Sequence, residues 1–115
     1  PQCLITTVGR KSGQPRTVTL VYGTLNSEFI LVGSNFGQKH HPAWALNLEA
    51  DSVAVMSIRG ESQRMTARLV TDPEERERMW QVMYAMWPAY NAYRGRAGRE
   101  IKMFALRADV ADVGT

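Results

Sequence analysis

The stretch SNFGQKHHPAWALNL, residues 34–48, joins a polar, glycine-bearing loop to the start of a short helix. Residues 28–33 precede it as a short, continuous apolar run, which is typical of a buried strand. Pro42 suits the first position of a helix, because its missing amide hydrogen would have had no partner there. We expect this helix to reach about Ala50. A strand, a polar loop and a helix start in this order predict a site for a flat, anionic ligand.

A second glycine-bearing loop lies upstream, at the tip of a predicted β-hairpin. Gln2 to Val8 and Thr17 to Tyr22 alternate or run apolar with β-branched residues, and turn-rich sequence separates them. Glycines in the intervening loop free the backbone to approach a ligand closely. The candidate anion-binding residues of this loop are Arg10, Lys11, Ser12, Gly13 and Arg16. A phosphate would suit them, since arginine offers paired donors in a planar fork and lysine a compact charge. The alternative is a set of solvated charges on a hairpin tip.

The rest of the chain predicts a second hairpin and two helices. Ser52 to Ile58 and Ser62 to Val70 flank a turn, and residues 24–27 read as another turn. Asp72 followed by proline and two glutamates is a strong helix start, and we expect that helix to end near Trp87. Its predicted core face consists of Met79, Val82, Met83, Met86 and Trp87. A short helix over residues 89–96 and a last strand over 102–108 complete the pattern.

Six predicted strands with interspersed short helices describe an α+β fold on an antiparallel sheet. Periodicity alone does not distinguish an open sheet from a barrel. The 115 residues, 44% of them hydrophobic, suffice for a single domain over residues 1–115. The first residue is Pro1 rather than Met, so we expect a preceding amino-terminal segment to be missing. A net charge of +3 and a pI of about 9.4 predict an anionic partner.

Three motifs resemble the deazaflavin-dependent nitroreductase and quinone reductase family: residues 6–13, residues 41–44 with Asn47 and Leu48, and residues 98–101. The resemblance extends from Leu4 to Leu106. It implies the split β-barrel of flavin reductases and an oxidoreductase. It also implies coenzyme F420 as the cofactor, a deazaflavin with a lactyl phosphate and a polyglutamate tail that binds in an open groove along the barrel. The single Cys3 cannot form an internal disulfide, which fits a cytoplasmic setting.

The resemblance also implies positions for the cofactor ring. It places the ring against Ser34, Asn35, Gly37 and Lys39, with Pro42, Ala43 and Asn47 from the helix start closing over it. A helix amino terminus favours the electron-rich edge of such a ring. Asn47 has an alternative interpretation as a surface polar residue, and Trp44 as a core residue rather than a cofactor contact.

The implied reaction is hydride transfer from reduced F420 to a quinone, with nitroaromatic reduction as an incidental activity. The protein's task would be positioning rather than covalent catalysis. In relatives, tyrosines of the carboxy-terminal helical segment line the acceptor side, and Tyr90 and Tyr93 match that pattern, whereas Arg96 replaces a third tyrosine. Either tyrosine could donate a hydrogen bond to developing negative charge, or simply pack.

Two other classes of function stay open: an FMN-dependent oxidoreductase on the same barrel, and a non-enzymatic binder of the cofactor or of a lipid. We expect no nucleic-acid partner, because the cations are divided between loops and acid-bearing helices. Adjacent His40 and His41 with a single cysteine, Cys3, give poor support for a metal site or a reactive thiol. The expected partners are a small-molecule electron acceptor, a second copy of the chain and, if the acceptor is a lipid quinone, a peripheral membrane contact.

Overall fold

The computed structural model describes residues 1–34, 40–96 and 100–109, and for residues 93–96 only the backbone. Asn35, Gly37 and Lys39 of the predicted cofactor site lie outside the described residues, as does the side chain of Tyr93. In chain order the elements are β1 (Gln2–Val8), β2 (Pro15–Val21), β3 (Gly23–Leu25), β4 (Glu28–Val32), α1 (Ala43–Ala50), β5 (Val53–Ile58), β6 (Glu61–Leu69), α2 (Pro73–Met86), α3 (Ala89–Arg96) and β7 (Met103–Ala108).

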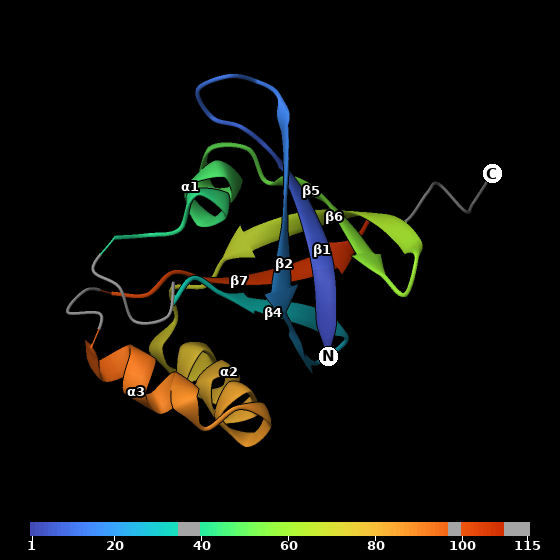
Figure 1. Cartoon of the computed structure of the whole chain (residues 1–115). Helices are drawn as coiled ribbons and strands as arrows, with labels where there is room; N and C mark the ends of the chain where they lie inside the picture. The colour runs from blue at the N-terminus through green and yellow to red at the C-terminus, as the bar shows by residue number, and fades with distance from the viewer. Residues whose placement is uncertain (35–39, 97–99, 110–115) are drawn as a thin grey trace.

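The strands form one antiparallel sheet in the order β2-β1-β5-β6-β7-β4-β3. Although β2 and β3 lie at opposite ends of this order, only Tyr22 separates them along the chain, so the sheet curls until its ends approach each other (Figure 1). The backbone amide of Tyr22 donates to the carbonyl of Pro1 at 3.2 Å. The predicted antiparallel split barrel with short helices is confirmed as a curled half-barrel.

The short strand β3 corrects the prediction of six strands. Residues 24–27 were expected to form a turn, but Leu25 pairs directly with Glu28. Only Asn26 and Ser27 form the turn, with φ values of 52° and 67°. Two consecutive positive φ values are typical of a two-residue hairpin turn, which lets both flanking strands pair up to its edges. The turn is therefore shorter than its polar composition indicates.

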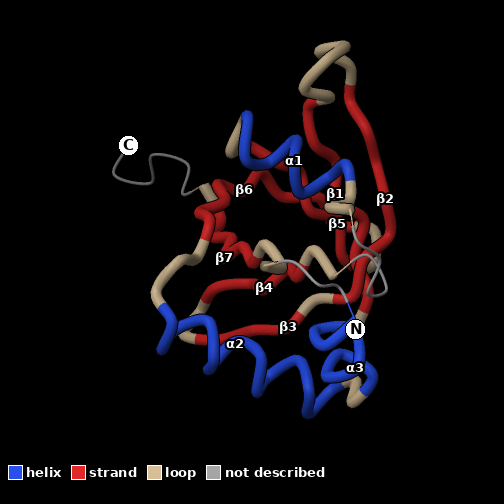
Figure 2. The backbone as a smooth tube through the Cα atoms, turned by 90° about the vertical axis from the view of Figure 1, so that its left-hand side faces the viewer, coloured by secondary structure: helices blue, strands red, loops and turns tan. Residues whose placement is uncertain are grey.

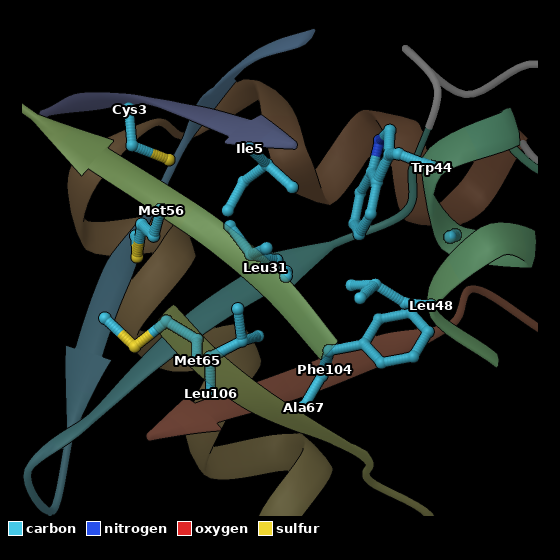
Figure 3. Close-up of a cluster of buried hydrophobic side chains, with 12 residues drawn as sticks. Cys3, Ile5, Leu31, Trp44, Leu48, Met56, Met65, Ala67, Phe104 and Leu106 are labelled. Atoms are coloured by element: carbon cyan, nitrogen blue, oxygen red, sulfur yellow. The ribbon is translucent and has the colours of Figure 1, made fainter. Parts of the chain in front are cut away.

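Apolar side chains fill two clusters on opposite faces of the sheet. Inside the curl, side chains from β1, β4, β5, β6, β7 and α1 pack together (Figure 3). Helices α2 and α3 lie outside the β3-β4 end of the sheet (Figure 2) and cover the second cluster. Strand β4 serves both, because successive side chains of a strand point to opposite faces: Leu31 belongs to the inner cluster and Ile30 to the outer one.

Helix α2 begins as predicted but faces the core differently. Asp72 caps it, accepting from the amide of Glu75 at 2.9 Å. The buried face includes Trp80, which was missed, whereas Met86 and Trp87, predicted to be in the core, are 36% and 41% exposed. The physical reason is that α2 ends at Met86, and Trp87 already has an extended backbone that leads into α3. Periodicity cannot locate this end.

Cys3 is buried in the inner cluster, and burial raises the pKa of its thiol to about 11, against a smaller lowering by a backbone hydrogen bond from Leu20. A thiol held protonated by desolvation is a poor nucleophile, as the sequence predicted. No helix in the described part of the chain has the length and hydropathy required to cross a membrane.

Candidate functional site

Two adjoining pockets lie between β2 and the start of α1. The larger has a volume of about 670 Å³ and the smaller about 380 Å³. Both are lined by Arg10, Val18, Ala43 and Trp44, so these four residues form a shared waist. We call the two pockets together the groove. Its smaller end lies under the β1-β2 hairpin tip, and its larger end reaches Trp87 and Tyr90 at the α2-α3 junction.

The hairpin tip brings the predicted anion-binding residues together at the smaller end of the groove. Arg10, Lys11, Ser12 and Arg16 all line it, and Figure 1 shows the tip standing beyond the sheet on the side of α1. The hydroxyl of Ser12 accepts from the amide of Gln14 at 3.1 Å and from Nη2 of Arg16 at 3.4 Å, which turns that guanidinium toward the loop. This end of the groove is positively charged.

Two glycines allow the tight backbone of this loop. Gly13 has a φ of +72°, a conformation that side chains disfavour. Gly9 donates to the carbonyl of Gln14 at 2.8 Å, and a Cβ at Gly9 would lie only 2.7 Å from the hydroxyl of Ser12. A side chain at Gly9 would therefore displace the Ser12 hydroxyl that holds Arg16. Gly13 was predicted among the anion-binding residues but lines neither pocket, so the structure supports only a conformational role for it.

Asn47 ties helix α1 to the hairpin tip. Its side-chain oxygen accepts from the backbone amide of Arg10 at 3.1 Å and from Nη1 of the same residue at 3.0 Å. Its side-chain nitrogen donates to the hydroxyl of Thr7 at 3.1 Å. Because Asn47 is only 2% exposed, the interpretation as a surface residue is wrong. The sequence did not indicate that Asn47 positions Arg10 at the waist of the groove.

The start of α1 forms one wall of the groove. Pro42 is the residue before the helix rather than its first residue, and its carbonyl accepts from the amides of Ala45 and Leu46 at 3.1 and 3.3 Å. The first amides of a helix have no carbonyl acceptor within it. Those of Ala43 and Trp44 are the groups that a helix start offers to an electron-rich ligand edge. Pro42 and Ala43 both line the larger pocket.

Trp44 is a core residue, as one of its two interpretations predicted, and it also lines the groove. It is 6% exposed and packs against Phe104 with ring centroids 5.9 Å apart (Figure 3), so it belongs to the inner core. It also lines both pockets. One side of the indole therefore holds α1 against the sheet while another part forms the wall of the groove. A buried core residue can therefore also lie against a ligand in the groove.

Aromatic side chains border the far end of the larger pocket. Tyr90 is buried between Trp80 and Trp87, with ring centroids 6.5 and 6.1 Å away. Tyr90 and Trp87 both line the pocket, and Ser34, at the end of β4, lines it too. The groove thus has a cationic end and an aromatic end, with the start of α1 between them.

The sequence did not single out several residues of the groove. Val18 and Leu20 line it from β2, and their alternation within the strand was a usable signal, because residues two apart share a face. His40 and His41 also line the larger pocket, although in the sequence analysis they were candidates only for metal binding. Among the described residues, no cluster of three or more metal-binding side chains occurs.

Comparison with known proteins agrees with this geometry. Residues 1–108 match the family described as F420H(2)-dependent quinone reductase. An F420H(2)-dependent quinone reductase of Mycobacterium tuberculosis is 30% identical over 109 residues, which cover 92% of this chain and 72% of the relative. Among solved structures, an F420-H2 dependent reductase has a TM-score of 0.83 and 31% identity, covering 93% of this chain and 94% of that one.

Another solved structure with the same TM-score of 0.83 and 31% identity is described as a domain-swapped dimer, and the match covers 93% of this chain and 80% of that chain. The match to the family covers nearly the whole chain and includes every strand and helix of the fold. The chain therefore belongs to the F420H(2)-dependent quinone reductase family, a family of oxidoreductase enzymes.

Proposed function

We propose that the groove holds coenzyme F420 and that the protein reduces a quinone with it. The observation that carries this proposal is the shared waist: a pocket lined by cations and a pocket lined by apolar and aromatic residues adjoin, and Arg10, Val18, Ala43 and Trp44 line both. A ligand with a flat ring and an anionic tail matches such a groove. When bound, the reduced cofactor supplies a hydride, since its ring passes electrons in pairs.

In the proposed arrangement, the anionic tail lies at the hairpin tip. Arg10, Lys11 and Arg16 donate charged hydrogen bonds to phosphate or carboxylate oxygens, and Ser12 and Gly13 keep the loop in shape. Asn47 contributes by holding Arg10, because its side-chain oxygen already accepts two hydrogen bonds from that residue. The tail end thus fixes the position of the ring.

The ring lies in the larger pocket. Ser34, Pro42 and Ala43 line it, and we extend the proposal to Asn35, Gly37 and Lys39 on the strength of the resemblance. The free amides at the start of α1 orient the electron-rich edge of the ring. The protein's contribution to the rate is orientation and exclusion of water, which can supply several kcal/mol of the barrier.

A flat quinone fits the aromatic end of the groove beside Trp87 and Tyr90. Reduction of nitroaromatics follows from the same geometry as an incidental activity. Tyr90 and Tyr93 are the proposed hydrogen-bond donors to the negative charge that develops on the acceptor oxygen.

Tyr93→Phe is expected to lower kcat with a quinone by about tenfold while leaving the affinity for F420 unchanged, because it removes a donor that acts only in the transition state. Steady-state kinetics and a separate cofactor titration measure the two quantities. Equal turnover of the variant and the parent would assign Tyr93 to packing.

The direct test of the function is mixing the protein with reduced F420 and a naphthoquinone under anaerobic conditions and following the return of F420 absorbance. Catalysed oxidation that saturates with quinone is expected. Binding of F420 without any acceleration over the uncatalysed rate would instead establish a non-enzymatic cofactor binder. Activity with FMN alone would identify a flavin enzyme on the same barrel.

A homodimer is part of the proposal, and the outer face of β2, β1 and β5 supports it. Leu4, Val8 and Val55 are 46%, 37% and 37% exposed there. Their cross-strand neighbours on β2, β1 and β5, such as Thr19 and Ser57, are uncharged, whereas Arg64 of β6 pairs with Val55 at the border of this face. A two-fold interface places like residues near one another, so a face that is largely uncharged suits self-association. Light scattering during gel filtration decides this: a dimer is expected, and a monomer at all concentrations would contradict it.

Cytoplasmic location with peripheral membrane contact completes the proposal. A single buried thiol fits a reducing compartment. The side chain of Trp87 is exposed and lines the larger pocket, and Met86, the residue before it, is exposed too, which suits a quinone drawn from a lipid surface. Co-sedimentation with phosphatidylglycerol vesicles is expected, and protein that stays in the supernatant at every lipid composition would contradict the contact.

A further inference from the structure

His41 lies between the groove and a second opening on the molecule. This outer cleft has a volume of about 290 Å³ and is bordered by β6, α2 and the segment before β7. Of the residues that the structure describes, His41 alone lines both the larger pocket and the outer cleft. Its side chain is partly buried, whereas the neighbouring His40 is exposed and lines the groove only.

The outer cleft connects His41 to solvent. Glu100 lines the cleft with a side chain that is 80% exposed, so water reaches it. Arg76 and Lys102 line the outer cleft together with His41, and each of these two cations lies near a carboxylate. Arg76 lies 3.8 Å from Glu100, and Lys102 lies 2.7 Å from Glu49. On the groove side, the titratable or charged residues among those that the structure describes are Arg10, His40 and Tyr90.

We propose that His41 delivers the second proton of the reduction. This inference rests on the proposed function. A quinone needs two electrons and two protons to become a hydroquinone, and a hydride supplies both electrons and one proton. The N–H bond of the His41 imidazolium breaks as the new O–H bond forms on the acceptor oxygen. The neutral imidazole then takes a proton from water through the outer cleft. Because His41 lines both spaces, this cycle can be completed without opening the groove.

The kinetic test compares His41→Gln with the parent across pH. In the parent, kcat/KM for a naphthoquinone is expected to fall as pH rises through the imidazole's titration, because only the imidazolium can donate. The variant is expected to be about a hundredfold slower near pH 6, which is the lower end of the range for general acid catalysis. It should approach the parent near pH 9, where the parent's imidazole is neutral too. A constant ratio across pH would overturn the proposal.

His40→Gln is the matched control, since it makes the same chemical change one residue away without touching the outer cleft. It is expected to retain the parent's fall in kcat/KM at high pH, whatever its absolute rate. Loss of that fall in His40→Gln, with retention in His41→Gln, would overturn the assignment. A parent enzyme without quinone turnover would refute the proposed function instead, and the next measurement would still test His41.

The second measurement needs no F420. In the His40→Gln protein, only one histidine ring signal remains, and NMR can follow its titration with and without added naphthohydroquinone. A ligand-dependent change in the titration midpoint of the His41 ring is expected if the imidazole contacts the acceptor oxygen. An unchanged midpoint at saturating hydroquinone would overturn the proposal.

Discussion

Ala43→Trp is expected to weaken the binding of F420 by at least about a hundredfold, which corresponds to roughly 2.8 kcal/mol. Ala43 lies at the shared waist of the groove and is the first residue of α1. An indole at this position would fill the passage between the two pockets, so that tail and ring could not bind together. Because Ala43 is exposed, the larger side chain displaces no core residue, and the fold should tolerate it.

Ala50→Trp is the matched control. Ala50 is the last residue of the same helix, is also exposed and lines neither pocket. Fluorescence titration of both variants should give nearly parental affinity for the control only. Thermal unfolding of both variants checks that the helix is intact. If Ala43→Trp bound the cofactor as tightly as the parent, the two pockets would not form one ligand site.

Lys11→Ala combined with Arg16→Ala is expected to weaken the binding of F420 by at least tenfold, roughly 1.4 kcal/mol. Both side chains line the smaller pocket and lie on an exposed hairpin tip. Their removal should therefore act on the anionic tail of the ligand rather than on the fold. The affinity of the parent should fall as salt rises, because exposed charges are screened. The double variant should show a weaker dependence on salt.

Arg78→Ala combined with Arg107→Ala controls for net charge. Both residues are exposed and line neither pocket of the groove. This variant loses two positive charges, as many as the Lys11→Ala, Arg16→Ala variant. If long-range attraction were the only contribution, F420 would bind equally weakly to both double variants. Calorimetric titration with F420 at low and high salt measures the affinity of each double variant and so distinguishes specific contact from long-range attraction. Equal losses in the two double variants would show that the hairpin tip makes no specific contact with the cofactor.

Much of the fold was predictable because its elements have clear local signals. Strand β1 matches its predicted bounds, and α2 starts at the predicted cap, where Asp72 accepts the amide of Glu75. The errors have a common physical cause. The length of β3 depends on backbone dihedral angles in a two-residue turn, and the exposure of Met86 and Trp87 depends on where α2 ends. Neither is encoded in periodicity.

The candidate site was predicted in part. The cations of the hairpin tip and the start of α1 could be identified because their residue types carry the chemistry themselves. The role of Asn47 could not be found in this way, since it arises from three hydrogen bonds to residues about 40 positions away in sequence. Likewise, His41 gains its position from a cleft that β6, α2 and the segment before β7 form together. Such roles follow from tertiary packing rather than from local sequence.

The most direct test is a parallel fluorescence titration of the purified chain with oxidised F420 and with FMN. Saturable binding of F420 at micromolar concentrations or below is expected, with weaker binding of FMN, because the cationic end of the groove suits a tail that carries several negative charges. Tighter binding of FMN, or binding of neither compound, would contradict the assignment of this groove to coenzyme F420.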